Sequence, residues 1–174
     1  MKIHYNIIIA GAGGIAEAAG LMLAEWSTVT PTIYIGNRTP LKAQNVAQWI
    51  MDGSTKPCKV IAFHLDPLNM SAEAQTIFKN GDALLDCLPG SLAPTLAECA
   101  TQNSLYYANL TEYVAETNQI IALAKHAKTG FVLQTGLAPG YIDVLAHVMF
   151  QEFCTRYKVN RADTLELKVG ALTK

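Results

Sequence analysis

Tyr5 to Ala16, with the sequence Tyr-Asn-Ile-Ile-Ile-Ala-Gly-Ala-Gly-Gly-Ile-Ala, decides the fold of this chain. A short β-branched apolar run stops at Gly11, glycine recurs at Gly13 and Gly14, and a helical apolar pattern follows at once. A G-x-G-x-x-G/A fingerprint needs this strand–turn–helix context, and Gly11, Gly13 and Ala16 stand at its three small positions. The stretch therefore predicts a dinucleotide-binding turn.

Each small residue of the turn has a physical role. Gly11 lets the chain turn sharply out of the strand, Gly13 lets backbone approach a pyrophosphate, and Ala16 allows the helix to pack closely on the strand. The phosphates would lie on the free N–H groups and the positive end of the helix. We expect cofactor contacts from Gly11, Ala12, Gly13, Gly14, Ile15 and Ala16. The alternative is a tight turn that binds no ligand.

Strand-like and helix-like segments alternate along the rest of the chain. Further strands are predicted at residues 33–35, 59–64, 83–87, 105–108 and 131–134. This alternation is typical of an α/β fold with a doubly wound parallel sheet and right-handed crossovers. We expect the Rossmann strand order 3-2-1-4-5-6, which puts a ligand crevice over the carboxyl ends of the first and fourth strands.

Apolar residues at helical spacing predict the buried faces of three helices. The first stripe is Ile15, Ala18, Ala19, Met22 and Trp26. The second is Ala43, Val46, Ala47 and Ile50, after Thr39 as helix cap and Pro40 as first helical residue. The third is Ile142, Leu145, Ala146, Met149 and Phe153.

A last strand is predicted at residues 164–169, after a complete doubly wound unit, and it has no evident partner within that unit. We expect it to begin a second domain that this chain lacks. The predicted organisation is a dinucleotide-binding Rossmann domain over residues 1–158 and the start of a truncated substrate or dimerisation domain over residues 159–174.

Composition narrows the class of protein. The chain has 174 residues, of which 51% are hydrophobic and 16% charged. Its net charge is −1, and its sequence contains no run of basic residues. Nucleic acid and anionic membranes are therefore not expected as partners, and no apolar stretch is long enough to span a membrane. The cysteines lack C-x-x-C spacing and the histidines lack ligand spacing, so we expect free thiols, no metal site and a cytoplasmic location.

The end of the second strand indicates which cofactor is bound. NAD-binding domains normally place Asp or Glu there to bind the ribose 2′-hydroxyl, but no carboxylate occurs from Trp26 through Met51. Gly36 instead precedes Asn37, Arg38 and Thr39. Glycine would leave room for a 2′-phosphate, and the arginine fork would bind it. The sequence therefore predicts NADP(H) in preference to NAD(H), against the alternative of a solvated arginine beside a capped helix.

Four segments together resemble the saccharopine dehydrogenase-like oxidoreductases, which include saccharopine reductases, lysine 6-dehydrogenases and carboxynorspermidine dehydrogenases. They are Gly11–Gly14, Asp86–Pro89, Asn109–Glu112 and, most specifically, the Gly-Leu-Ala-Pro-Gly sequence of residues 136–140. The family often has Asp where Asn109 stands. Separately, residues 37–39 are similar to the NADP-binding turn of shikimate dehydrogenases.

The resemblance implies hydride transfer at a carbon–nitrogen bond of an amino acid or polyamine precursor. By position, residues 37–39 would hold the 2′-phosphate and Asp66 would lie near the adenine. Cys87, Leu88, Pro89, Thr111 and Gly136 would contact the nicotinamide half. Glu112, Leu137, Ala138, Pro139 and Gly140 would face the substrate, with no catalytic residue assigned.

Simpler structural roles remain open for several of these residues. Asp66 can begin an Asp-Pro turn, and Cys87 can be a small core residue. Glu112 and Asp143 can lie in first turns of helices, where acidic residues complement the dipole.

A small-molecule substrate and a homodimer are expected. Two further functions stay open: a stand-alone NADP(H)-binding or redox-sensing module that works through a partner, and a shikimate dehydrogenase relative.

Overall fold

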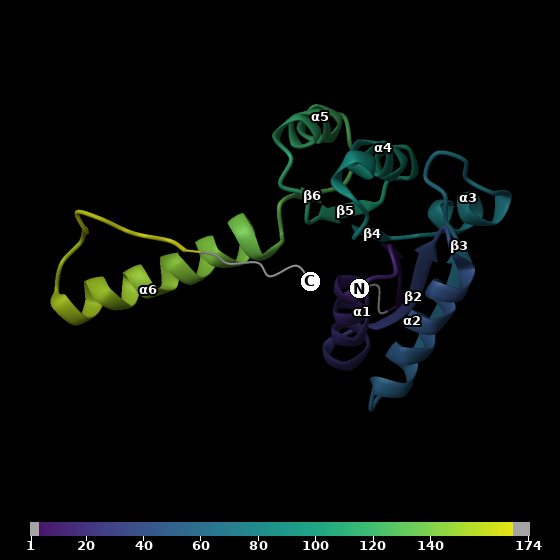
Figure 1. Cartoon of the computed structure of the whole chain (residues 1–174), viewed down its shortest axis with the longest axis horizontal. Helices are drawn as coiled ribbons and strands as arrows, with labels where there is room; N and C mark the ends of the chain where they lie inside the picture. Colours follow the sequence, from purple (N-terminus) through teal and green to yellow (C-terminus); the bar gives the residue numbers. More distant parts are fainter. Residues whose placement is uncertain (1–3, 169–174) are drawn as a thin grey trace.

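The computed structural model describes residues 4–168, with the side chains of Ala138 and Pro139 left aside. Its sheet is parallel and six-stranded, in the order β3-β2-β1-β4-β5-β6 that the sequence predicts (Figure 1). The strands are β1 (His4–Ala10), β2 (Thr30–Asn37), β3 (Lys59–His64), β4 (Ala83–Asp86), β5 (Tyr106–Asn109) and β6 (Phe131–Val132). The helices are α1 (Gly14–Trp26), α2 (Pro40–Gly53), α3 (Ala72–Lys79), η1 (Gly90–Leu92), α4 (Ala93–Asn103), α5 (Val114–Ala124), η2 (Leu137–Tyr141) and α6 (Ile142–Tyr157).

Two apolar clusters hold helices on opposite faces of the sheet. One joins Ile9 and Ile33 to α1 and α2, whose buried residues include the complete predicted stripe of α2, Ala43, Val46, Ala47 and Ile50. The other joins Ile8 and Leu84 to α3, α4 and α5. Because neighbouring residues of a strand point to opposite faces, Ile8 and Ile9 belong to different clusters. The doubly wound, Rossmann-type fold is confirmed.

The predicted buried face of α1 is wrong. Ala16, Gly20 and Ala24 are its buried residues, whereas Ile15, Met22 and Trp26 are exposed. Steric packing explains the difference, since a Cβ on Gly20 would overlap the Ile50 side chain of α2. The smallest residues of α1 therefore face α2 and the sheet, whereas Ile15, Met22 and Trp26 point away.

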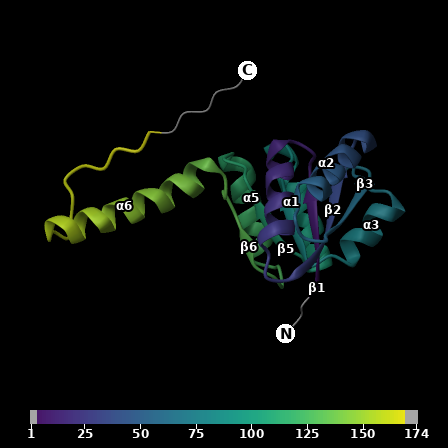
Figure 2. The ribbon, with the colours of Figure 1, turned by 90° about the horizontal axis from the view of Figure 1, so that it is seen from below.

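The buried stripe predicted for α6 is also wrong, because Ala146 is the one buried residue that this helix contributes. Met149 and Phe153 are exposed. In both views α6 extends away from the sheet rather than lying against it (Figures 1 and 2). The helical pattern is correct, but within residues 4–168 no other element covers Met149 and Phe153.

The final strand predicted from Thr164 is not formed over residues 164–168, which have no regular secondary structure. Val169, its last predicted residue, lies outside the described residues. The face of β5 and β6 opposite the α4–α5 layer is open, with Tyr106 and Val132 both exposed. Within residues 4–168, no helix is long and apolar enough to cross a membrane. Nor do those residues contain a cluster of three His, Cys, Asp or Glu side chains suited to a metal.

Candidate cofactor site

Gly11 directly follows β1 and contacts the ends of β2 and β4 at the carboxyl edge of the sheet. Its φ of 125° lies in the region that favours glycine, and its amide donates to the Gly36 carbonyl of β2 at 2.8 Å. A Cβ at Gly11 would lie 2.9 Å from the carbonyl oxygen of Cys87, the residue after β4. The sharp turn predicted at Gly11 is therefore formed, and the protein itself requires a glycine there.

Gly13 and Gly14 differ from Gly11, because a Cβ at either position would meet no described atom within 4 Å. Gly13 is the N-cap of α1 in extended backbone, and no side chain caps the helix. The first N–H groups of a helix lack partners within it. The start of α1 thus presents bare backbone donors beside open space, as a pyrophosphate site requires. Ala16 is fully buried as predicted, and Ile15 is exposed at the rim.

The turn after β2 is organised by Asn37. Its Oδ1 accepts a hydrogen bond from the Thr39 amide at 2.9 Å. Thr39 is the N-cap of α2 with Pro40 as the first helical residue, as predicted, but its own side chain caps no amide. Arg38, between them, is exposed. The turn therefore fixes the backbone on both sides of Arg38 and leaves its guanidinium in solvent.

Gly36 has a packing role that differs from the predicted one. A Cβ on this buried residue would lie 2.7 Å from both Phe63 and Leu65 side-chain atoms. The space next to Gly36 is thus filled by apolar side chains rather than left for a 2′-phosphate. Packing between β2 and the end of β3 is sufficient to explain this glycine.

Asp66 forms the Asp-Pro turn that the sequence left open. Its Oδ1 accepts from the Leu68 amide at 3.1 Å, and its carbonyl accepts from the Asn69 amide at 3.1 Å. The carboxylate therefore has a structural role at the end of β3, at the same edge of the sheet as Gly11.

A pocket of about 320 Å³ brings together residues from three of the predicted segments. It is lined by Ile15 of α1, by Cys87, Leu88 and Gly90 after β4, and by Leu110, Thr111, Glu112 and Tyr113 after β5. Gly90 lies so close to Thr111 and Tyr113 that a Cβ there would overlap both. Pro89 is exposed between Leu88 and Gly90. The loops after β4 and β5 thus interlock beside the first turn of α1.

Residues 136–140 do not line this pocket. The Tyr141 amide donates to the Gly136 carbonyl at 2.9 Å and closes a single wide turn, η2. A Cβ on Gly140 would lie 2.6 Å from the Gln134 carbonyl oxygen, so close backbone contact requires glycine there. Leu137 is exposed, and Ala138 and Pro139 are described as backbone only. Gly136 comes nearest to the pocket through Leu110, whose carbonyl oxygen a Cβ would meet at 3.4 Å.

The structure distinguishes between the roles that the sequence left open for Glu112, Asp143 and Cys87. Glu112 precedes Tyr113, the N-cap of α5, so it is an exposed loop residue at the pocket rather than part of a first helical turn. Asp143 does lie in the first turn of α6. Burial, with the nearby Asp86 charge, raises the pKa of Cys87 to about 12. The thiol is therefore protonated near neutral pH and is not an activated nucleophile.

A buried polar cluster under the pocket was not predicted. Asp86, Tyr107 and Asn109 are each no more than 2% exposed, and the Tyr107 hydroxyl donates to Asp86 Oδ2 at 2.9 Å. Burial raises the pKa of Asp86 to about 6, although hydrogen bonds from Leu88 and Tyr107 oppose the shift. The available signal was an acidic residue at the end of an otherwise apolar strand.

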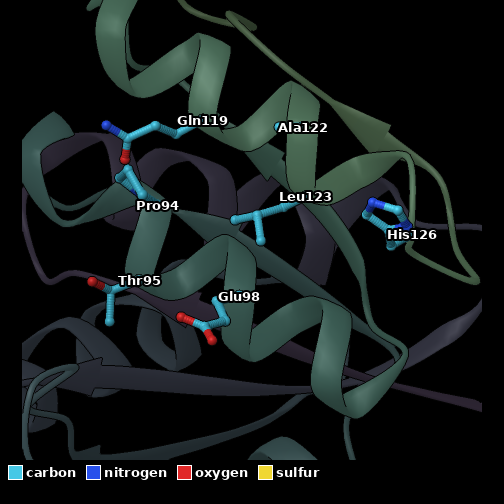
Figure 3. Close-up of a pocket in the computed structure, with 7 residues that line it drawn as sticks. All are labelled: Pro94, Thr95, Glu98, Gln119, Ala122, Leu123 and His126. Carbon is cyan, nitrogen blue, oxygen red and sulfur yellow. The ribbon is translucent and has the colours of Figure 1, made fainter.

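Another hollow, of about 500 Å³, lies between α4 and α5 and is shown in Figure 3. Pro94, Thr95 and Glu98 line it from α4, and Gln119, Ala122, Leu123 and His126 line it from α5 and the residues after it. None of the predicted cofactor residues is among them. The glycine turn and the pocket beside it are therefore the better candidate for the cofactor site.

The strand order, the Gly11 turn and the uncapped start of α1 define a Rossmann-type dinucleotide-binding domain. Residues 7–133 match the family described as the saccharopine dehydrogenase NADP binding domain, and the chain belongs to that family. The resemblance found from the sequence motifs is confirmed. A comparison with curated proteins found no match.

Solved structures of oxidoreductases share the fold. Apo saccharopine dehydrogenase (L-Glu forming) from Saccharomyces cerevisiae matches with a TM-score of 0.68 and 20% identity, over 87% of this chain and 32% of its own. Shikimate dehydrogenase from Mycobacterium tuberculosis matches at 0.60 and 16% identity, over 87% and 51%. The 3-ketoreductase KijD10 from Actinomadura kijaniata, solved with NADP and TDP-benzene, matches at 0.61 and 14% identity, over 88% and 42%. This chain spans at most 51% of the length of these proteins.

Proposed function

We propose that this chain binds NADP(H), in preference to NAD(H), and forms the cofactor half of an oxidoreductase that acts on the carbon–nitrogen bond of an amino acid or polyamine precursor. The pyrophosphate lies on the first turn of α1, and Asn37, Arg38 and Thr39 bind the 2′-phosphate. The nicotinamide lies at the pocket formed after β4 and β5, near Leu88 and Thr111.

One observation carries the dinucleotide assignment. Gly13 and Gly14 have neither a positive φ nor a close protein neighbour that would require glycine. At Gly14, the first residue of α1, glycine gives up helix propensity relative to alanine, whereas glycine is an accepted residue at the N-cap position of Gly13. Close approach of a ligand to the backbone accounts for both glycines where protein packing does not.

Substitution of Gly13 by Ala tests this assignment. The added methyl group meets open space, but alanine is a weaker N-cap than glycine, so Gly13→Ala is expected to lower the unfolding free energy by no more than about 1 kcal/mol. It is expected to weaken NADPH binding by about tenfold or more, through the displaced phosphate. Gly130→Ala is the matched control, since its Cβ would make an ordinary contact with Tyr106 at 3.8 Å. Unchanged NADPH affinity in Gly13→Ala would contradict the assignment.

The NADP(H) preference is supported by the exposed position of Arg38 on a turn held by Asn37. Guanidinium groups bind phosphate through paired donors, and Thr39 adds a hydroxyl and the start of α2 adds backbone N–H groups. The family name, which includes NADP, agrees with this assignment.

The substrate class is proposed from the family alone, and hydride transfer is the chemistry that the nicotinamide supplies. Glu112 is the one carboxylate lining the pocket of about 320 Å³ and is the candidate for contact with substrate nitrogen. The pocket is open, so we expect the 174-residue chain to bind NADPH without reducing an amino-acid imine. Turnover by this chain would contradict that expectation. A homodimer, a cytoplasmic location and a domain boundary at residue 158 stay predictions.

A further inference from the structure

The segment after β4 and the segment after β6 are each tied to a buried polar side chain of the sheet. The Leu88 amide donates to Asp86 Oδ1 at 3.0 Å. The Gln134 amide donates to Asn109 Oδ1 at 3.1 Å, and Thr135 donates to the Asn109 carbonyl through both its amide and its hydroxyl. Side chains at the ends of β4 and β5 thus set the positions of the two chain segments that leave the sheet there.

Gln134 is held in an unusual backbone conformation. Its φ of 58° is in the left-handed region, which is uncommon for a residue with a side chain. The Gln134 carbonyl is also the group against which Gly140 packs. The amide of Asn109 therefore supports a strained turn on which the Gly-Leu-Ala-Pro-Gly segment lies.

Tyr107 lies between Asp86 and Asn109, the two side chains that hold these segments. It shares a face of β5 with Asn109, two residues on, and Asp86 is the direct neighbour of Asn109 across the sheet. The Tyr107 hydroxyl donates to Asp86 Oδ2 at 2.9 Å and approaches the Ala93 carbonyl at the start of α4 at 3.3 Å. Burial and the Asp86 charge raise the pKa of Tyr107, and the Asn109 side chain opposes this shift.

The Nδ2 group of Asn109 is a buried donor on the same side chain. Because Oδ1 accepts from Gln134, the Nδ2 group must take the other position of the amide. Nδ2 is fully buried and makes no hydrogen bond of normal geometry to any group within residues 4–168. A hydrogen bond from Nδ2 to the Tyr107 oxygen would complete a continuous chain from Leu88 to Gln134.

We propose that Asp86, Tyr107 and Asn109 act as one positioning network that couples the Cys87–Gly90 loop to the Gln134–Gly140 segment. These three residues touch no cofactor atom themselves; they fix the separation of two backbone segments beside the nicotinamide half. The role in cofactor binding rests on the proposed function, whereas the coupling is a property of the ligand-free chain.

Amide hydrogen exchange of the ligand-free protein, resolved by residue with NMR, tests the coupling. Tyr107→Phe keeps the ring contact with Phe131 and is expected to speed exchange at the Gln134 amide, which it does not touch, by about tenfold. Asn109→Ala is expected to speed exchange at the Leu88 amide to a similar degree. Tyr106→Phe, the exposed neighbour on β5, is the matched control and should change neither amide. If Tyr107→Phe changes exchange at the Leu88 amide alone, and Asn109→Ala at the Gln134 amide alone, the network is refuted.

Titrations with NADPH and with 2′,5′-ADP test the link to the cofactor. If the parent protein binds both, Tyr107→Phe should weaken NADPH by about five- to tenfold and leave 2′,5′-ADP within about twofold, because the loss of one buried hydrogen bond acts on the nicotinamide half alone. Equal loss for both ligands, or for neither, overturns the positioning role. If the parent binds neither ligand, the proposed function fails, and the exchange experiment still decides the coupling.

Discussion

The Tyr107 hydroxyl donates a hydrogen bond to Asp86 Oδ2 at 2.9 Å, across neighbouring strands and away from solvent. Asp86 also accepts from the Leu88 amide at 3.0 Å. These two donors stabilise the ionised carboxylate, yet burial outweighs them and raises the pKa of Asp86 to about 6. The carboxylate at the end of β4 therefore titrates close to physiological pH.

This titration predicts a pH dependence of stability. In the unfolded chain Asp86 ionises near its ordinary pKa of 3.8, which is a lower pH than in the folded chain, where its pKa is about 6. Its contribution to the free energy of unfolding is therefore fully present below about pH 4 and falls by about 3 kcal/mol as the pH rises through about 6. Asp86→Asn lacks this contribution, so denaturant unfolding from pH 4 to 7 should show the parent losing stability relative to the variant.

A carboxylate on the surface provides the control for this measurement. Asp163 is exposed near the C-terminal end of the described residues. Asp163→Asn should follow the parent at every pH. Parallel stability curves for the parent and Asp86→Asn would refute the assigned titration.

The sequence predicted the layers of the fold well and the exposed faces poorly. Strand order follows from the alternation of elements and from handedness, and the α2 stripe is correct because that helix packs on one sheet face. Met22 and Phe153 show the limit, because an apolar residue at helical spacing is buried only if another element covers it. Periodicity describes the helix itself and not its neighbours.

The site was predictable from the sequence at positions where the backbone conformation requires a particular residue type. Gly11 needs glycine for its φ, and the capping sequence Thr39-Pro40 fixes a helix start. The Asp86–Tyr107–Asn109 cluster was not predictable, because its members are separated in sequence and meet only through the register of β4 and β5. The packing of Gly36 on Phe63 and Leu65 depends in the same way on a neighbouring strand.

Gly36→Ala separates a packing role from a cofactor role. Because the new methyl group would overlap Phe63 and Leu65, the variant is expected to lose about 1–3 kcal/mol of unfolding free energy, as overpacked cores do. Chemical denaturation measures the loss, and Gly130→Ala is again the control. Full stability combined with a selective loss of NADPH affinity would instead favour the original interpretation, in which Gly36 makes room for a 2′-phosphate.

Cys87 is expected to react slowly with alkylating reagents. Its pKa of about 12, compared with an ordinary value of 9.0, lowers the thiolate population at pH 8. The reduction is on the order of a thousandfold, and the thiolate is the reactive form. Timed iodoacetamide labelling followed by peptide mass spectrometry should find Cys87 modified far more slowly than free cysteine in the same tube. Labelling as fast as free cysteine would contradict the buried, protonated state.

The most direct test of the cofactor assignment is a fluorescence titration of NADPH against NADH, repeated on Arg38→Ala and on Arg156→Ala, which removes an exposed arginine of α6. NADPH is expected to bind the parent and Arg156→Ala at least about tenfold more tightly than NADH, a margin that one charge-assisted hydrogen bond can supply and that should largely vanish in Arg38→Ala. Equal binding of both cofactors to the parent would contradict the NADP(H) assignment.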